Sequence, residues 1–193
     1  SEDVLAAIQA IRKLGIKVFI GQKKSNIIDA KIIVVSTAIS EINKEYVAAK
    51  KMFLPIVHRA EMLGELMRLK QSIAIAGTHG KTTTTSLIAK MIEENGMDPT
   101  IINGGIISSL DSNAKLGNGE WMVVEADESD GSFAKLNPTV AIITNIDLEH
   151  LDFHKSEENL EKAFFQFVSS IPFYGFVCLC IDHPRTQKLI SKL

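Results

Sequence analysis

The stretch Ile73–Ser86, IAIAGTHGKTTTTS, places a glycine-bounded loop between a strand pattern and a helix pattern. The apolar and partly β-branched residues before Gly77 predict a buried strand. Beyond the loop, apolar residues recur at helical spacing, and Gly96 is a candidate C-terminal stop for that helix. A strand, a glycine loop and a helix in this order are the context of a phosphate-binding loop.

The loop itself carries the chemistry that phosphate binding needs. Its backbone N–H groups would converge on an anion at the positive end of the helix. Lys81 would reach the outer phosphates, and the Thr82 hydroxyl would join the shell of a magnesium ion. The usual G-x-x-x-x-G-K-[ST] pattern is shortened here, since Ile75 holds the place of its first glycine. The alternative is an ordinary strand-to-helix turn with a solvated lysine. The predicted nucleotide contacts in the loop are Gly77, Thr78, His79, Gly80, Lys81, Thr82 and Thr83.

Length and composition describe an ordinary globular chain. Its 193 residues predict one or two domains, with 46% hydrophobic residues, 23% charged residues and a net charge of −2. This balance calls for neither a nucleic acid nor an anionic membrane surface as partner. No apolar run approaches the ~20 residues of a membrane helix, and no basic-then-apolar signal opens the chain. We therefore expect no membrane insertion and a cytoplasmic location.

The cysteines Cys178 and Cys180 lie two residues apart in a strand-like run. On a strand they would point to the same face, where a disulfide between them would be strained. We expect buried free thiols, which fit a reducing compartment.

The order of predicted elements indicates an α/β protein. Helical patterns alternate with apolar strand patterns, and the strands read as near-continuous apolar runs, which favours mostly parallel sheets covered on both faces. We predict a Rossmann-like N-terminal domain over residues 1–70, lacking its first strand, and a P-loop-type α/β domain over 71–193, both incomplete. The predicted helices are 2–14, 43–52, 59–69 and the segments after Lys81 and Ser156; the predicted strands are 16–20, 30–36, 54–58, 72–76, 121–125, 139–144 and 175–181.

Further site residues are expected at strand ends, where open α/β sheets place their ligands. Glu125 ends one predicted strand, and its carboxylate suits magnesium, a cation that prefers oxygen ligands; the alternative is a solvated acid. Asn145 follows the next strand and would deliver its amide to a nucleotide. His150 lies just beyond, although imidazole is a poor first choice for magnesium. The acidic turn from Asp127 to Asp130 would shape the loop or touch substrate.

The remaining histidines and the late helix have simpler interpretations. His154 and His183 are expected to be loop residues, and His79 either donates to a phosphate or fills space. Ser156 is a candidate N-cap. The helix that follows it carries a core-facing stripe of Leu160, Phe164, Phe167 and Val168.

Three blocks, GTHGKTTTTS, EADESDGSF and TNIDLEHLDF, together resemble the Mur ligase family in content and order, and the upstream VVSTAIS and HRAEMLGELM fit the same family. The likeness runs from about Ala30 to Ile181. It implies a first domain for a uridine diphosphate moiety, a central domain for ATP, and a third domain for the amino acid. We expect this chain to hold most of the first and much of the second, with the third absent.

The resemblance also implies an activity. Such ligases convert a carboxylate to an acyl phosphate with ATP, and an amine then attacks it. The blocks are most like those of the member that joins L-alanine to UDP-N-acetylmuramic acid in peptidoglycan precursor synthesis. By the family's pattern Lys81 supplies a fixed charge, Thr82 and Glu125 hold Mg²⁺, and His150 helps to bind a second ion. The family's pattern places Ser36, Thr37, Ala38 and Ile39 by the uridine diphosphate, with His58 in a neighbourhood of basic residues.

Two other functions remain open at this stage. One is a sister ligase that adds a murein peptide to the same sugar nucleotide, since its phosphate loop looks alike. The other is a nucleotide-binding module without chemistry of its own, which would require loops ordered by the γ-phosphate. Testing a panel of amino acids as acceptors with the complete protein distinguishes the sister ligase from the L-alanine ligase. Ligase activity of the complete protein excludes the binding module.

Overall fold

The computed structural model describes residues 2–107, 112–129, 131–149 and 154–193. The chain divides into two compact units, Ser1–Arg59 and Ala60–Leu193, which we describe separately. The predicted domain assignment, with its boundary at Gln71, stays a prediction. In the part of the chain that the structure describes, no helix has the length and apolarity needed to cross a membrane.

The first unit is a small α/β arrangement. Strands β1 (Ile33–Val35) and β2 (Ile56–His58) pair in parallel, and helix α2 (Lys44–Lys51) connects them. Helix α2 begins where the Asn43 side chain accepts hydrogen bonds from two backbone N–H groups of its first turn. The hydrophobic core of this unit consists of the buried residues Ile27, Ala48 and Ala49 and the partly buried residues Ala30, Ile33, Leu54 and Ile56. Helix α1 (Glu2–Lys13) and the 3-10 turn η1 (Lys24–Ile27) precede the sheet.

The strand predicted over 16–20 is wrong. This segment has no regular secondary structure, and Phe19 and Ile20 are 55% and 71% exposed. A strand needs a neighbour to satisfy its backbone groups, and within the described residues the sheet of this unit contains only β1 and β2. Apolar composition by itself therefore overstated the strand signal here.

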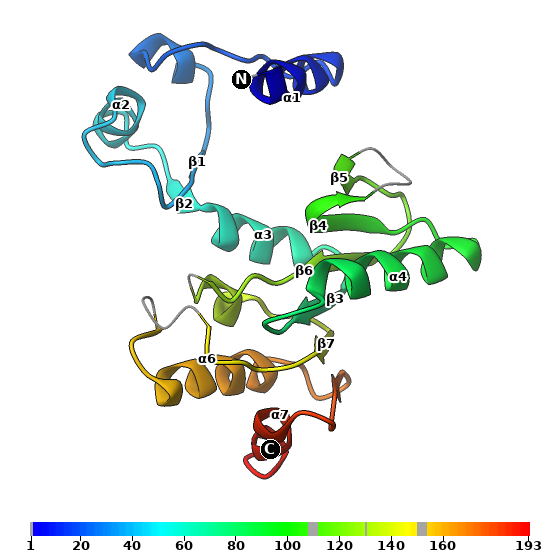
Figure 1. The fold of residues 1–193 in the computed structure, drawn as a ribbon. Coiled ribbons are helices and arrows are strands. Elements are labelled where there is room, and N and C mark those ends of the chain that lie inside the picture. Colours follow the sequence, from blue (N-terminus) through cyan, green and yellow to red (C-terminus); the bar gives the residue numbers. More distant parts are fainter. Residues whose placement is uncertain (1, 108–111, 130, 150–153) are drawn as a thin grey trace. The chain divides into compact units, whose positions relative to one another are not determined.

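The second unit confirms the predicted α/β class with a mostly parallel sheet. Its six strands lie in the order β5-β4-β6-β3-β7-β8, and every pairing is parallel except that of β4 with β5. Figure 1 shows the strands and helices of this unit in the order of the chain. The elements are α3 (Arg59–Met67), β3 (Gln71–Ala76), α4 (Lys81–Glu94), β4 (Thr100–Ile107), β5 (Ser112–Lys115), β6 (Trp121–Glu125), the 3-10 turn η2 (Ser132–Lys135), β7 (Val140–Ile143), α6 (Glu157–Ser169), β8 (Phe176–Leu179) and α7 (Pro184–Ile190).

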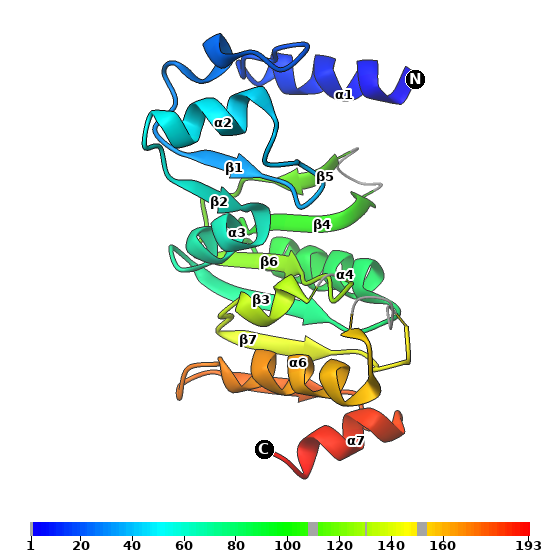
Figure 2. The same ribbon diagram turned by 90° about the vertical axis from the view of Figure 1, so that its left-hand side faces the viewer.

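Helices cover both faces of this sheet, as the apolar strands require. Helix α4 packs on one face, where Ala89 meets Ile75, Ile101 and Val123. On the other face, seen toward the viewer in Figure 2, α3, η2 and α6 cover the strands. The predicted stripe of α6 is confirmed, because all four of its apolar residues are buried, and Ser156 caps the helix through Asn159 N. Phe164 and Phe167 pack against Phe133 with ring centroids 5.0 and 5.3 Å apart.

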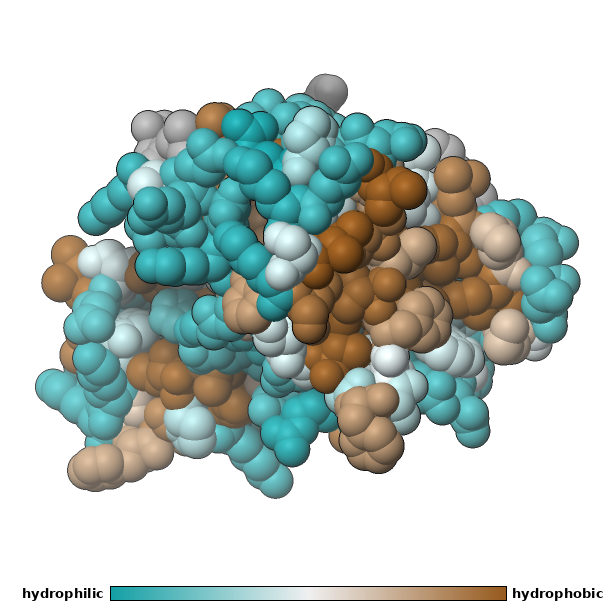
Figure 3. Space-filling view, turned by 90° about the horizontal axis from the view of Figure 1, so that it is seen from below, coloured by the Kyte–Doolittle hydropathy of each residue, from teal (hydrophilic) through white to brown (hydrophobic). Residues whose placement is uncertain are grey.

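The cysteine prediction is half right. Cys178 in β8 and Cys180 just after it are free thiols, but they are exposed. The reason is that β8 ends the sheet, and α4 contacts β3, β4 and β6 instead of reaching it. Apolar side chains are therefore uncovered here, and Figure 3 shows a hydrophobic patch in the middle of the face seen from below. Phe173, Tyr174, Phe176 and Ile181, on and beside β8, are among the exposed apolar residues of this unit.

Candidate active site

The loop of residues 77–80 lies at the switch point of the sheet. It follows β3, and the chain then passes through α4 to β4 on one side, whereas β7 on the other side of β3 leads through α6 to β8. Helices α4 and α6 pack on opposite faces. The carboxyl ends of β3 and β7 therefore lie side by side at the edge of the sheet where open α/β sheets bind ligands.

The loop is attached closely to the segment that follows β7. Thr78 N donates to Asn145 O at 3.1 Å, and Thr144 Oγ1 donates to His79 O at 2.7 Å. A Cβ on Gly77, whose φ is +132°, would lie 2.2 Å from Thr144 Oγ1, so only glycine fits there. Gly80, with φ +80°, starts α4. These constraints fix the loop backbone before any ligand arrives.

Asn145 is part of this attachment. Its Oδ1 accepts from His79 N at 2.8 Å and its Nδ2 donates to His79 O at 2.9 Å. The side-chain amide thus pairs with the loop backbone much as a neighbouring strand would. The predicted contact between Asn145 and a nucleotide stays a prediction.

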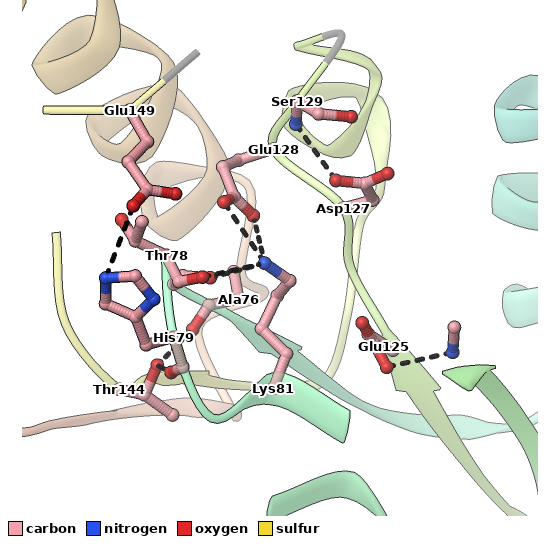
Figure 4. Close-up of polar contacts among 12 residues, drawn as sticks. Ala76, Thr78, His79, Lys81, Glu125, Asp127, Glu128, Ser129, Thr144 and Glu149 are labelled. Atoms are coloured by element: carbon pink, nitrogen blue, oxygen red, sulfur yellow. Dashed lines mark hydrogen bonds and ion pairs between the residues drawn. The ribbon is translucent and has the colours of Figure 1, made fainter. Parts of the chain in front are cut away.

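Lys81 is the first residue of α4, and its ammonium turns back over the loop. It donates to Gly77 O at 2.8 Å and to Thr78 O at 3.3 Å. It also lies 2.8 Å from Oε2 and 3.1 Å from Oε1 of Glu128, as Figure 4 shows. The Lys81 side chain is 13% exposed and that of Glu128 is 1% exposed, so this is a buried ion pair. Sequence analysis placed Glu128 only within an acidic turn.

Thr82 points to a different carboxylate. Its Oγ1 donates to Glu125 Oε2 at 2.9 Å, and Gly104 N donates to the same oxygen at 2.8 Å. A Cβ on Gly104 would lie 2.6 Å from Glu125 Oε1, so the backbone of β4 can approach the carboxylate only because this residue is glycine. The predicted partners Thr82 and Glu125 are thereby brought together at one edge of the sheet. Gly104, which the sequence analysis missed, holds the carboxylate in place.

Histidines surround the site in a way that the sequence did not indicate. His79 Nε2 lies 3.4 Å from Asp147 Oδ2 and 3.6 Å from Glu149 Oε1. His183 Nε2 lies 3.0 Å from the other oxygen of Asp147, and His154 is buried with its Nε2 2.8 Å from Glu128 O. His183 lies in the loop before α7, as predicted, and contacts Asp147, whereas His154 is buried beside Glu128. Spacing could not reveal this, because the contacts cross 26 to 36 residues.

Other predicted residues lie elsewhere or are not described. The segment Ser36–Ile39 forms a turn after β1 in the first unit, with Ile39 N donating to Ser36 O at 3.0 Å. His58 ends β2 in that unit and is exposed. Thr83 is exposed in the first turn of α4. His150 lies outside the described residues. Within the described residues, no group of three or more His, Cys, Asp or Glu side chains could hold a metal ion.

Comparison with known proteins bears on the same segments. Residues 75–193 match the Mur ligase middle domain, and residues 4–71 match the Mur ligase family catalytic domain. The chain belongs to the Mur ligase family. The predicted family resemblance is confirmed.

Curated relatives are similar along almost the whole chain. The UDP-N-acetylmuramate--L-alanine ligases of Rhodospirillum rubrum and Parvibaculum lavamentivorans are 56% and 58% identical to it over 188 residues, which is 97% of this chain. The match covers 39% and 38% of those proteins, so this Mur ligase chain spans about two fifths of their length.

Solved structures agree with the fold. UDP-N-acetylmuramate-alanine ligase from Thermotoga maritima is 31% identical with a TM-score of 0.80, and the match covers 93% of this chain and 42% of that one. The UDP-N-acetylmuramate:L-alanyl-gamma-D-glutamyl-meso-diaminopimelate ligase from Neisseria meningitides is 24% identical with a TM-score of 0.82, and the match covers 96% of this chain and 63% of that one. At that identity the second likeness shows the fold alone.

Proposed function

We propose that this Mur ligase joins L-alanine to the carboxylate of UDP-N-acetylmuramic acid in peptidoglycan precursor synthesis, with ATP activating the carboxylate as an acyl phosphate. The observation that carries the proposal is the convergence of Lys81, Thr82 and Glu125 at the switch point of the sheet. The names of the 56–58% identical relatives support the choice of L-alanine and of this sugar nucleotide.

The residues of the phosphate loop are proposed to bind ATP. The N–H groups of Thr78 and His79 donate to Asn145, whereas the N–H groups at the N-terminus of α4 lie where the helix dipole favours an anion. Lys81 adds one fixed positive charge at the same place. Phosphoryl transfer depends on positioned charges, and the attachment of the loop to Thr144 and Asn145 provides that positioning without later reorganisation.

The residues around Glu125 fit a magnesium ion. Thr82 Oγ1 and Glu125 Oε2 are hard oxygen donors 2.9 Å apart at the end of β6, and Mg²⁺ characteristically takes one or two protein oxygens together with waters and phosphate. We propose these two residues as its ligands, and His150 as a contributor to a second ion by the family's pattern. When bound, Mg²⁺ would neutralise charge on the phosphates. Glu125 is already oriented for this role by Gly104 N.

The first unit is proposed to bind the uridine diphosphate moiety. Ser36, Thr37, Ala38 and Ile39 form the turn at the carboxyl end of β1, the edge at which parallel sheets place ligands. We propose a cytoplasmic location, because ATP and nucleotide sugars are cytoplasmic substrates.

The test uses the full-length protein with UDP-N-acetylmuramic acid, ATP and Mg²⁺. L-alanine, a murein tripeptide, or no acceptor is added, and the product is identified by mass spectrometry while ADP is counted. We expect one L-alanine joined per ADP released, and no joined product in the Lys81→Ala variant. Ligation of the tripeptide alone would identify the sister ligase. Nucleotide binding with no joined product would identify a passive binding module.

A further inference from the structure

The ammonium of Lys81 already has a full set of partners. A lysine has three N–H donors, and three acceptors surround this one: Gly77 O, Thr78 O and the Glu128 carboxylate. Glu128 is the only charged group among the three, and it is the shortest contact together with Gly77 O, both at 2.8 Å. A phosphate that binds Lys81 must therefore displace or share one of these acceptors.

The two sides of the ion pair differ in their freedom to move. Glu128 is 1% exposed, and its backbone carbonyl accepts from Gly131 N at 3.1 Å and lies 2.8 Å from His154 Nε2. The turn that carries it is also closed by Ser129 N donating to Asp127 Oδ1 at 3.0 Å. Lys81 approaches from the first turn of α4 on a flexible four-carbon stem. The carboxylate is thus fixed, and the ammonium is held against it.

We infer that Glu128 is a positioning residue for Lys81: its buried carboxylate holds the ammonium over the phosphate loop and at the same time competes with the nucleotide phosphates for it. Glu128 thereby lowers the affinity of the loop for nucleotide. In return it fixes the orientation of the Lys81 ammonium, the charge that phosphoryl transfer uses. The part of the inference that concerns turnover rests on the proposed ligase function; the part that concerns phosphate binding rests on the ion pair alone.

Because Glu128 competes with the phosphates for Lys81, we expect that removing its charge strengthens ATP binding. Glu128→Gln removes one negative charge close to the bound phosphates but retains a side chain of the same shape with an oxygen that still accepts from Lys81. Because a buried carboxylate beside the phosphates repels their negative charge, we expect ATP without Mg²⁺ to bind about tenfold more tightly. The orientation of Lys81 is less well fixed in this variant, so kcat should fall about tenfold. A residue with a merely structural role would weaken binding instead.

The experiment compares full-length variants by calorimetry with Mg²⁺-free ATP and by steady-state ligation. The matched control is Asp127→Asn, which removes a carboxylate from the same turn where it is exposed and accepts from Ser129 N instead of Lys81. We expect its ATP affinity to stay within about twofold of the wild type. Thermal unfolding shows whether the Glu128→Gln variant is folded. If it is folded and binds ATP as tightly as the wild type or more weakly, the inference is overturned.

A second variant keeps the proposal testable if the glutamine variant does not fold. Glu128→Asp retains the charge and withdraws it by one methylene, so ATP affinity should stay within about twofold while kcat falls at least fivefold, because the ammonium follows the shorter carboxylate or loses it. Unchanged kcat in this variant would overturn the positioning role. A wild-type protein that binds no ATP would refute the proposed function and this inference with it, whereas ATP binding that Glu128→Gln does not tighten would refute the inference alone.

Discussion

Lys81 and Thr82 are neighbours in the sequence, yet they serve two different halves of the site. Lys81 and Glu128 form an ion pair in which both side chains are buried, whereas Thr82 meets Glu125 at the end of β6, where the carboxylate is only half-buried. The two glutamates are three residues apart on the segment leaving β6. A strand end followed by a turn thus supplies one buried counter-charge for the Lys81 ammonium and one half-buried carboxylate, which we propose as a magnesium ligand. Burial, more than residue type, separates their roles.

The largest expected effect comes from removing the buried ion pair between Lys81 and Glu128. Lys81→Ala should lower ligation by about a hundredfold or more, because one preorganised charge at the phosphoryl group is lost. The protein should still fold, with a lower unfolding temperature, since Glu128 is left buried without its counter-charge. Steady-state kinetics and thermal unfolding measure both effects.

The control for that variant is Lys90→Ala on the same helix, where the lysine is 59% exposed and pairs with Glu94. It should leave turnover unchanged. Near-normal turnover in Lys81→Ala would contradict the proposal that residues 77–82 bind the phosphates of the nucleotide.

Substitutions at Glu125 and His150 should change the magnesium requirement of the activity. Glu125→Ala, and separately His150→Ala, should raise the Mg²⁺ concentration for half-maximal activity about tenfold, and more than either raises the KM for ATP. Magnesium titrations at saturating ATP measure this. Glu120→Gln, at the other end of the same strand, is the matched control. An unchanged magnesium requirement would return Glu125 to the role of a solvated strand-end acid.

A smaller effect is expected when the carboxylate is moved but kept. Gly104→Ala would place a Cβ 2.6 Å from Glu125 Oε1, which displaces the side chain and removes its alignment with Thr82. We expect a rise of about threefold in the magnesium requirement, since outer contacts of a metal ligand tune its affinity. Adding Gly104→Ala to Glu125→Ala should have no further effect, because the two act through one group. Additive effects in the double variant would show that Gly104 acts by another route.

The smallest effect is expected at an ion pair in the open. A hydrogen bond from the Asn118 backbone, together with Lys115, lowers the pKa of Asp98 from its ordinary value to about 2. A lowered pKa in the folded state means that this group stabilises the fold above pH 4 and that the contribution is lost as pH falls toward 2. Asp98→Asn should therefore flatten the acid limb of the unfolding curve slightly in that window. An identical acid limb would show that the exposed pair contributes nothing measurable.

Local patterns carried much of this structure. The apolar strands β3, β6, β7 and β8, the loop after Gly77 and the stripe of α6 were all predicted, since each is defined by residues close together in the chain. The shared location of Lys81, Thr82 and Glu125 also followed, because the carboxyl ends of parallel strands meet at one edge. Strands β4 and β5 were missed: β4 contains two adjacent glycines and β5 is polar, so neither has a clear strand pattern.

The α/β class, the glycine loop after β3 and the residue types in that loop could be predicted from the sequence alone, because those depend on spacing along a few turns of chain. Only the tertiary structure decided which carboxylate each loop residue meets: Lys81 pairs with Glu128 across 47 residues and Thr82 with Glu125 across 43. The exposure of Cys178 and of the 16–20 segment was likewise decided by which neighbours are present. Pairing and burial depend on strand order, and strand order is a property of the folded sheet that no local pattern encodes.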